Sequence, residues 1–220
     1  MNQRRADSTV SMPRKAETTT RVLLLRHGAA EGSKEGFFYG STDAPLLAEG
    51  EAQVREAAAR VKGWLMESET ALYASSLTRS VRTAEILSGA MGLGLKPVIV
   101  PDISELHLGD WEGETHASLS DKEPERLDEH YRNFVHSRPP GGGESVAELA
   151  ARVLPAFREI CAREKEKNVI VCAHAAVNRV ILCDALAAPL ESFFRLEQDF
   201  AALNVIDLHE GTPLVRAMNI

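Results

Sequence analysis

The chain has 220 residues, of which 44% are hydrophobic and 26% are charged, and 25 basic against 32 acidic residues give a formal net charge of -7. These proportions are ordinary for a soluble globular protein, and they exclude a disordered chain, a collagen-like fibre and a disulfide-rich miniprotein. No apolar run approaches the roughly 18–20 residues that a membrane-spanning helix needs. The acidic balance argues against nucleic acid as a partner, because phosphate backbones attract basic surfaces.

Residues 1–20 are rich in Arg, Ser and Thr and lack the hydrophobic segment of a secretory signal. We therefore expect a flexible N-terminal extension there, followed by a single domain over residues 21–220. Cys161, Cys172 and Cys183 are odd in number, form no Cys-x-x-Cys pair and stand in apolar surroundings, which is typical of reduced core residues in a cytoplasmic protein. These features leave the oligomeric state open, with a homodimer as one alternative.

Short apolar runs alternate with amphipathic segments from Thr20 onward. A continuous apolar run is typical of a strand buried on both faces, whereas apolar residues three or four apart indicate a helix. Predicted strands are Val22–Leu25, Ala71–Ala74, Val98–Val100, Val169–Cys172 and a last one at Leu203–Leu208. Predicted helices are Ala48–Met66, Arg79–Met91, a stripe from Val146 to Cys161, and a segment that ends near Leu186. This alternation predicts an α/β fold, a three-layer α/β/α sandwich around a mostly parallel central sheet.

Several residues mark where these elements begin, end or bend. Gly92 is expected to end the second helix, and Ser145 with Glu148 makes a capping box for the third. Pro155 lies inside that third helix and is predicted to kink it. The charged segment Asp121–Ser137 carries three apolar or aromatic anchors, and we expect it to form a surface helix or a lid.

Polar residues follow the ends of the predicted strands. Arg26 and His27 come directly after the first strand, and Arg79 follows the second. Glu105 and His174 follow the next two. Ligands of open α/β sheets bind beyond the carboxyl ends of the strands. These five side chains are therefore expected to meet at one edge of the sheet.

The residue types in this set point to phosphate chemistry without a metal ion or a cofactor. The forked donors of Arg26 and Arg79 match the oxygens of a phosphate. One neutral imidazole can attack phosphorus, and a second can donate hydrogen bonds to the phosphoryl oxygens as charge builds. A glutamate, here Glu105, can transfer a proton to the leaving alkoxide.

Six blocks of sequence follow one another from Leu25 to His174. The first is a strand followed by Arg-His-Gly, and the last is the strand-ending histidine. Between them lie Gly-x-x-Asp-x-Pro-Leu with a later Gly-x-x-Gln, Ser-x-Leu-x-Arg with Thr-Ala, Glu-x-x-x-Gly-x-Trp-Glu-Gly, and Pro-Gly-Gly-Glu-Ser with one extra glycine. Their matching positions are Gly40, Asp43, Pro45, Leu46, Gly50, Gln53, Ser75, Leu77, Arg79, Thr83, Ala84, Glu105, Gly109, Trp111, Glu112, Gly113, Pro140, Gly142, Gly143, Glu144 and Ser145. In this order the blocks resemble the histidine phosphatase superfamily, in the branch that includes cofactor-dependent phosphoglycerate mutases and α-ribazole phosphatases.

The resemblance implies a phosphoglycerate mutase-like fold and a phosphohistidine intermediate. His27 would carry the phosphoryl group, which Arg26, Arg79 and His174 would bind. Glu105 would donate a proton and later act as the base for water. The short chain and the Trp-Glu-Gly block look more like the phosphatase members, such as the α-ribazole phosphatases. The resemblance thus implies a phosphatase for a small phosphorylated metabolite.

The chain departs from the family pattern at three positions. An Ala-Ala pair that begins at Ala29 follows Arg-His-Gly, where Glu-Thr or Glu-Ser is frequent in the family. Ala175 replaces the usual glycine after the second histidine. Ser33 stands where asparagine is frequent, and it keeps a hydroxyl that is expected to bind phosphate. Phe38 and Tyr39 are candidates for the substrate pocket.

Other interpretations of the same residues stay open. Glu112 and Asp110 are rivals of Glu105 as the proton donor, and His107 either lines the pocket or has a structural role. A metal site from His27, His107 and His174 would need a carboxylate or thiolate partner and conflicts with the arginines, so none is expected. The alternatives to a phosphatase are a mutase that passes the phosphoryl group to a second acceptor and a non-catalytic protein that binds phosphate esters.

Overall fold

Strand β1 (Thr19–Arg26) lies inside the sheet and carries the first apolar run of the chain. The computed structural model describes residues 19–220, in which β1 pairs in parallel with β4 (Asn168–Ala173) and antiparallel with β5 (Leu203–His209). Successive side chains of a strand point to opposite faces, so an unbroken apolar run needs cover on both sides. The burial of β4 at every position agrees with this requirement.

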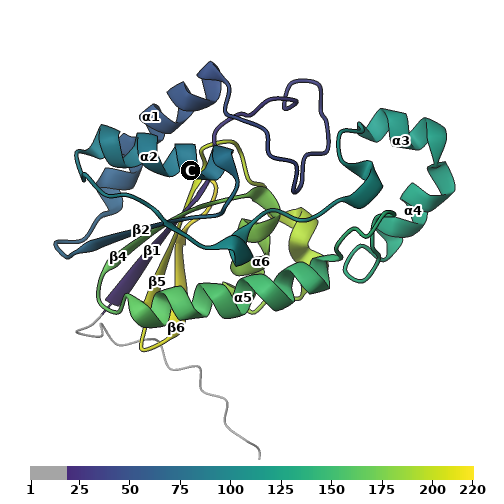
Figure 1. Ribbon diagram of the computed structural model, residues 1–220. Coiled ribbons are helices and arrows are strands. Elements are labelled where there is room, and N and C mark those ends of the chain that lie inside the picture. The colour runs from purple at the N-terminus through teal and green to yellow at the C-terminus, as the bar shows by residue number, and fades with distance from the viewer. Residues whose placement is uncertain (1–18) are drawn as a thin grey trace, which may run out of the picture.

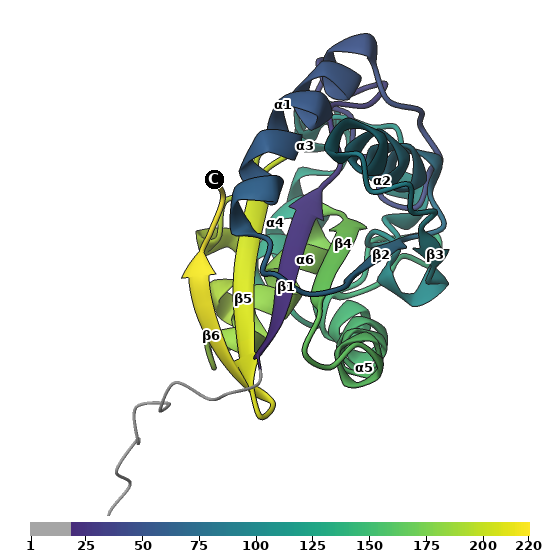
Figure 2. The same ribbon diagram turned by 90° about the vertical axis from the view of Figure 1, so that its left-hand side faces the viewer.

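Six strands form the sheet, in the order β3-β2-β4-β1-β5-β6 (Figure 2). Strand β2 (Thr70–Ala74) pairs in parallel with β4 and with β3 (Val98–Ile99), and β6 (Thr212–Ala217) pairs antiparallel with β5. Among the strands of residues 19–220, only β5 runs against the others. The predicted α/β fold with a mostly parallel sheet is confirmed.

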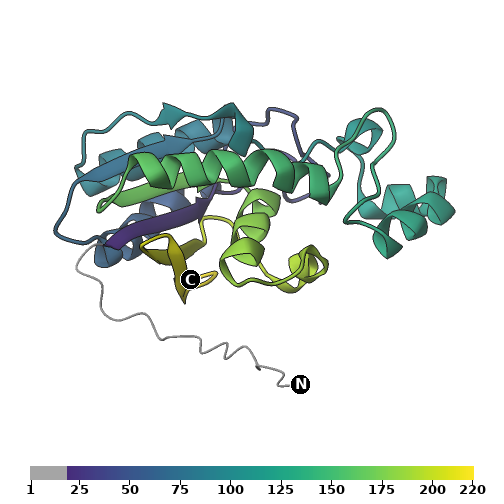
Figure 3. The same ribbon diagram turned by 90° about the horizontal axis from the view of Figure 1, so that it is seen from below.

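Helices cover both faces of this sheet (Figure 1). Helices α1 (Ala48–Trp64) and α2 (Thr78–Met91) pack on one face. Helices α5 (Val146–Arg163) and α6 (Ala175–Ala185) pack on the other, where they lie side by side in Figure 3. The molecule therefore has the three layers that the alternation of strands and helices predicts.

The alternating side chains of β1 divide the interior into two cores. Val22 and Leu24 belong to the core under α5 and α6, whereas Leu23 and Leu25 belong to the core under α1 and α2. All four side chains are fully buried. Burial of such a side chain stabilises the fold by roughly 1.5–3 kcal/mol. Strand β1 is consequently packed into both cores up to the residue before Arg26.

The helix boundaries follow from local signals. Helix α2 ends at Gly92, whose φ of 71° is the left-handed conformation that glycine adopts without strain. Helix α5 begins with the predicted capping box of Ser145 and Glu148. It continues through Pro155 without ending, and the kink at that residue stays a prediction. Short 3-10 helices are η1 (Pro101–Ile103), η2 (Gly109–Trp111) and η3 (Leu190–Arg195).

A lobe of residues 111–132 lies to one side of the sheet (Figure 1). It contains α3 (His116–Lys122) and α4 (Pro124–Arg132). The surface helix predicted over Asp121–Ser137 is confirmed in part, because α4 lies within that range. Its own small core consists of Trp111, Leu119 and Leu127. We call this segment the α3–α4 lobe.

Two predicted strands are present as β3 and β5, but the predicted burial of the first and the predicted last place of the second are wrong. The segment at Val98–Val100 is not buried, because β3 is an edge strand with one partner, and its two residues, Val98 and Ile99, are 48% and 43% exposed. Leu203–Leu208 is not the last strand, because β6 follows it. Exposed and half-buried residues alternate in β6, so this edge strand has no continuous apolar run to reveal it.

The start of β1 also differs from the prediction. Thr19 and Thr20 belong to β1, where they pair with His209 and Leu208, so the strand begins two residues before the expected boundary. Threonine is β-branched and suits a strand, and the hydroxyl of Thr20 accepts a backbone N–H from Glu166. The rest of the predicted extension lies outside the described residues. Within residues 19–220, the helices are too short or too polar to cross a membrane.

Candidate active site

His27 lies just beyond the carboxyl end of β1, and its side chain is buried. Ring atom Nδ1 is 2.7 Å from the carbonyl oxygen of Gly28, and Nε2 is 3.3 Å from Nε of Arg79. A carbonyl only accepts a hydrogen bond and a guanidinium only donates one. The proton of the neutral imidazole is therefore on Nδ1, and Nε2 presents its lone pair to Arg79.

Two glycines allow the backbone after His27 to meet α1. A Cβ on Gly28 would lie 2.2 Å from the carbonyl oxygen of Gly50, and a Cβ on Gly50 would lie 2.0 Å from that of Ala29. Gln53 of α1 also accepts the N–H of Ala29. The first turn of α1 thus packs backbone to backbone on the His27 loop and determines its path.

His174 follows β4 and is the residue before α6. Its ring centre is 5.2 Å from that of His27, and its side chain is fully buried. Nε2 lies 2.6 Å from Oγ of Ser75, which itself accepts the N–H of Leu77. The hydroxyl of Ser75 can therefore donate its hydrogen bond to Nε2. In that arrangement the proton of the neutral ring is on Nδ1. This Nδ1 is buried and has no partner within the described chain.

Arg79, in the first turn of α2, is 2% exposed. Its Nη1 donates to the carbonyl oxygen of Thr42 and its Nη2 to that of Gly40, both at 2.7 Å. Arg82, one turn further along α2, is instead exposed and pairs with Glu51. Of these two arginines, Arg79 is the one that reaches the buried histidines.

Arg26 ends β1, and its guanidinium carbon lies 3.8 Å from the ring centre of Phe200, in a cation–π contact. One Nη donates to the carbonyl of Gln198, and the buried Nε has no hydrogen-bond partner among residues 19–220. Within residues 19–220, the hydrogen bonds of Arg26 and Arg79 go to carbonyl oxygens and to His27. No carboxylate is bonded to either guanidinium in that part of the chain.

Burial and charge together set the protonation of the site. Burial lowers the pKa of Arg26 to about 10. Burial, reinforced by the charges of Arg26 and Arg79, lowers the pKa of His27 well below its ordinary 6.5. Burial also lowers the pKa of His174, and the charges of His27 and of the arginines lower it further. At neutral pH, two uncharged imidazoles therefore lie beside two charged guanidinium groups.

Glu105 approaches the two arginines from the loop after η1. Its charge raises the pKa of Arg26 and of Arg79, against the larger lowering by burial. Oε2 accepts the N–H of Ala176 in the first turn of α6 at 3.2 Å, and Oε1 accepts the N–H of Leu106 at 2.9 Å. The carboxylate is thus near both guanidinium groups without being bonded to them.

The residues predicted to carry the chemistry come from distant parts of the chain and lie at one edge of the sheet. Contacts and charge effects join all five of them. They are Arg26, His27, Arg79, Glu105 and His174. Their roles in a reaction stay predictions.

The other candidate residues make contacts of a different kind. Ser33 bonds through its hydroxyl to the backbone three residues earlier and closes a local turn. Phe38 packs against the small core of the α3–α4 lobe, and Tyr39 is half-buried. His107 is exposed, and its ring accepts a backbone N–H two residues further on. Phosphate or substrate binding by these four side chains stays a prediction.

The remaining aromatic and histidine side chains serve packing or face solvent. Trp111 is buried and belongs to the small core of the α3–α4 lobe. His116 and His136 are exposed, whereas His130 is half-buried, with its ring centre 4.9 Å from that of Trp111. No group of three or more His, Cys, Asp or Glu side chains in residues 19–220 is arranged to hold a metal ion.

Some residues that support the site could not be predicted from the sequence. Phe200 lies under Arg26, and Arg152 of α5 donates to the carbonyl of Glu105 while it pairs with Glu144. Only Glu144 stands in one of the recognised blocks. The other two have no local signal, because their partners are far away in the sequence.

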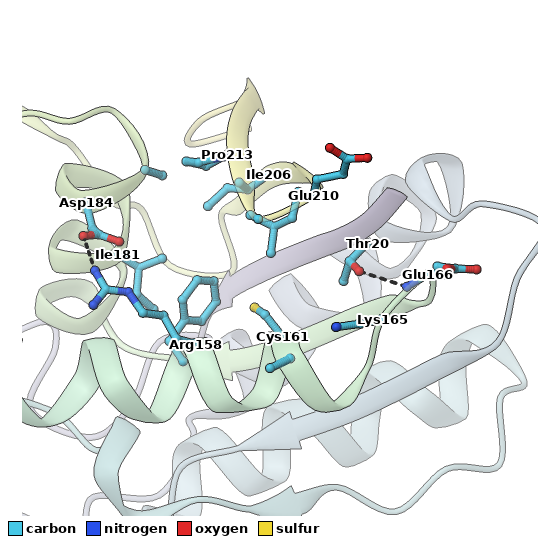
Figure 4. A pocket seen from close by; sticks show the side chains of 15 residues that line it. Thr20, Arg158, Cys161, Lys165, Glu166, Ile181, Asp184, Ile206, Glu210 and Pro213 are labelled. Atoms are coloured by element: carbon cyan, nitrogen blue, oxygen red, sulfur yellow. Dashed lines mark hydrogen bonds and ion pairs between the residues drawn. The ribbon is translucent and has the colours of Figure 1, made fainter. Parts of the chain in front are cut away.

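A groove of about 650 Å³ lies at the start of β1, the end opposite His27 (Figure 4). Thr20 lines it, and an ion pair between Arg158 and Asp184 stands at its side. Burial raises the pKa of Cys161, another lining residue, to about 12, so its thiol is protonated and unreactive. The groove therefore contributes no group to the cluster around His27.

A three-layer α/β fold with two buried imidazoles and two arginines at the carboxyl edge of its sheet fits a protein that handles phosphate esters. Comparison with protein families matches residues 22–220 to the histidine phosphatase superfamily (branch 1). The chain belongs to this superfamily.

Relatives of the chain carry both phosphatase and mutase names. It is 32% identical over 205 residues to the bifunctional protein Rv2228c of Mycobacterium tuberculosis, a match that covers 92% of this chain and 54% of that protein. The chain thus spans about half the length of this relative. It is 26% identical over 205 residues to the 2,3-bisphosphoglycerate-dependent phosphoglycerate mutase of Rhizobium etli, covering 90% and 96%. The structure of the mycobacterial glucosyl-3-phosphoglycerate phosphatase Rv2419c with VO3 superposes with a TM-score of 0.78 at 27% identity, covering 90% and 98%.

Proposed function

We propose that the chain hydrolyses phosphate monoesters of small metabolites through a phosphohistidine on His27. The observation that carries this proposal is the pair of contacts that the two nitrogens of this ring make. The carbonyl of Gly28 holds the proton on Nδ1, and the lone pair of Nε2 faces Arg79. Such an imidazole needs no additional base, because the attacking nitrogen carries no proton.

Buried donors without partners support a phosphate site beside His27. Nε of Arg26 and Nδ1 of His174 lack a hydrogen-bond partner within the described residues. Leaving a buried donor unpaired costs about 1–3 kcal/mol. Phosphoryl oxygens would accept hydrogen bonds from both atoms and from Arg79, and they would offset the positive charge of the cluster.

The proposed reaction has two steps. In the first, Nε2 of His27 attacks phosphorus, the bond from phosphorus to the alcohol oxygen breaks, and protonated Glu105 gives its proton to that oxygen. In the second, water attacks phosphorus, the phosphorus–nitrogen bond breaks, and Glu105 takes a proton from the water. Inorganic phosphate leaves, and the imidazole of His27 and the carboxyl group of Glu105 return to their starting states. The two arginines and His174 stabilise the charge on the phosphoryl oxygens.

A transfer of the phosphoglycerate mutase type is the second candidate. The relative from Rhizobium etli favours it by name, and the first step on His27 would be the same. The two activities differ in whether water or a second alcohol accepts the phosphoryl group. Product analysis with 3-phosphoglycerate and 2,3-bisphosphoglycerate separates them: free phosphate supports hydrolysis, and rapid isomerisation supports transfer.

The substitution His27→Ala tests the proposal. We expect it to lower turnover of p-nitrophenyl phosphate and of a panel of phosphate esters by about 10³-fold or more. His116→Ala, which changes an exposed histidine of α3, serves as the control and should retain wild-type turnover. Wild-type protein quenched during turnover of ³²P-labelled substrate should carry an acid-labile, alkali-stable label that His27→Ala lacks. Undiminished turnover by His27→Ala would contradict the proposal.

A further inference from the structure

The turn formed by Gly40, Ser41 and Thr42 is bound on one side by the carboxylate of Glu112. Oε1 accepts the backbone N–H of Ser41 at 2.8 Å and of Leu108 at 3.1 Å. Oε2 accepts the N–H of Gly40 at 3.0 Å and of Thr42 at 3.1 Å. The hydroxyl of Ser41 donates to Oε1 as well. Five donors occupy the lone pairs of this carboxylate, which leaves it no free site for proton transfer.

The opposite side of the same turn is bound by Arg79. The carbonyl oxygens of Gly40 and Thr42 accept hydrogen bonds from its two Nη atoms. The N–H groups of these two residues therefore point to an anion, Glu112, while their carbonyl groups point to a cation. In this position of the guanidinium, Nε faces Nε2 of His27.

Asp43 ties the turn to the helix that carries Arg79. Its Oδ1 accepts both the N–H and the hydroxyl of Thr78, each at 2.8 Å. Thr78 is the first residue of α2, and Arg79 is the second. A displaced turn would therefore disturb both the carbonyl groups that orient the guanidinium and the backbone that carries it.

Packing and charge hold the turn in this arrangement. A Cβ on Gly40 would lie 1.9 Å from a neighbouring backbone oxygen and 2.7 Å from Oε1 of Glu112. Burial raises the pKa of Glu112, but hydrogen bonds from Thr42, Leu108 and Ser41 outweigh it and leave the pKa below the ordinary value. The ionised carboxylate polarises the peptide groups of the turn, which strengthens their carbonyl oxygens as acceptors.

We propose that Glu112 is a positioning residue for phosphate binding, which holds the turn at residues 40–42 so that the guanidinium of Arg79 is directed at His27. The inference rests on the proposed function, because it takes Arg79 as a phosphate-binding residue. It also separates Glu112 from Glu105, its rival as proton donor. Glu112 acts through backbone groups on an arginine, whereas Glu105 lies beside both arginines.

Glu112→Gln is the test variant. The amide keeps the shape of the side chain, but its nitrogen would face N–H donors of the turn instead of accepting from them. We expect kcat/KM and the affinity for orthovanadate to fall about 10- to 100-fold, with an unchanged circular dichroism spectrum. Glu114→Gln is the matched control, because Glu114 bonds to Ser118 and Lys122 rather than to the turn. This variant should bind orthovanadate as the wild type does.

A double-mutant cycle with Arg79→Ala separates positioning from a general loss of structure. Without the guanidinium, Glu112→Gln should weaken orthovanadate binding by no more than about 2-fold further. Equal losses in the presence and absence of Arg79 would overturn the inference, and so would wild-type affinity in Glu112→Gln itself. If Glu112→Gln does not fold, Glu112→Asp, which keeps the charge on a shorter side chain, replaces it in the same cycle.

Failure of the proposed function would look different from failure of this inference. In the first case, the wild type neither hydrolyses phosphate esters nor binds orthovanadate. In the second, the wild type does both, and the two glutamine variants bind orthovanadate equally well. Calorimetric titration of orthovanadate into wild type, Glu112→Gln and Glu114→Gln therefore distinguishes the two.

Discussion

Protonation of single residues links the chemistry of the site to the stability of the fold. His27 and His174 are uncharged because burial disfavours their cationic forms and nearby charges add to that effect. The uncharged state supplies the lone pair on Nε2 of His27. It also means that acid has to place charge in a buried and already positive cluster. Stability and the availability of the nucleophile therefore depend on the same two rings.

We expect the free energy of unfolding to fall as the pH drops below about 6.5, the ordinary histidine pKa. Below that pH the unfolded chain binds protons at His27 and His174, while the folded chain, with lowered pKa values, does not. The unfolded state then gains up to about 1.4 kcal/mol per pH unit for each histidine. Above pH 6.5 the two rings contribute no pH dependence.

Urea unfolding of wild type and His174→Asn from pH 7.5 to 5.0 checks this expectation. The variant should lose less stability over that range, because one of the two buried imidazoles is absent. His116→Asn changes an exposed histidine and should follow the wild-type curve. Three parallel curves would show that the buried rings do not oppose protonation.

At the scale of elements, α1 shows how one residue type has two opposite effects within a helix. Gly50, in its first turn, meets the backbone of Ala29, where a Cβ would be 2.0 Å from the carbonyl oxygen. Gly63, in its last turn, has no atom within 4 Å of the position of a Cβ. The first glycine permits a contact that shapes the His27 loop, whereas the second only adds conformational freedom to the unfolded chain.

Alanine at these two positions should therefore change stability in opposite directions. We expect Gly63→Ala to raise the free energy of unfolding by about 0.5–1 kcal/mol. Gly50→Ala should lower it by about 1–3 kcal/mol, because the backbone has to move to admit the methyl group. Gly50→Ala should also reduce kcat/KM, because the backbone that it displaces, at Ala29, comes directly after the His27 loop begins and determines the position of His27. Urea denaturation and steady-state assays measure both effects, and stabilisation by Gly50→Ala would refute the close contact.

The burial of interior strands could be predicted from the sequence, and the exposure of edge strands could not. The apolar run in β4 announces a strand with neighbours on both sides, and every residue in β4 is buried. The run at Val98–Val100 has the same composition but lies at an edge. Composition reports β-propensity, whereas burial depends on how many neighbours the topology supplies. Strand β6 lies at the other edge, where exposed and half-buried residues alternate, and it lacks the continuous apolar run that marks a strand buried on both faces.

The candidate site shows the same division between local and long-range information. His27 and His174 could be placed together because each directly follows a buried strand, and parallel strands bring their carboxyl ends to one edge. The role of Glu112 in holding the turn at residues 40–42 could not be predicted. The N–H groups of the turn that its carboxylate binds lie about 70 positions away in the sequence. Such a contact depends on where a loop returns after the sheet has formed, which no local pattern encodes.

At the scale of the whole molecule, the two faces of the sheet and the α3–α4 lobe differ in the size of their cores. Each face buries a large apolar cluster against two helices. The lobe has a core of three buried residues, with Phe38 and Leu108 packed against it. Few buried contacts mean a low free energy of local opening. The lobe should therefore open far more often than the sheet unfolds.

Hydrogen exchange followed by mass spectrometry tests this hierarchy. Amides of residues 111–132 should exchange faster than those of β1 and β4, whose exchange should require global unfolding. Leu127→Ala removes one of the three buried lobe residues, a loss of about 2–5 kcal/mol in a packed core. It should speed exchange within the lobe alone, whereas Leu149→Ala, in the core under α5, should speed exchange throughout the sheet. If Leu127→Ala lowered the protection of β1 as much as that of the lobe, the lobe would unfold together with the sheet, and its separate core would have no separate stability.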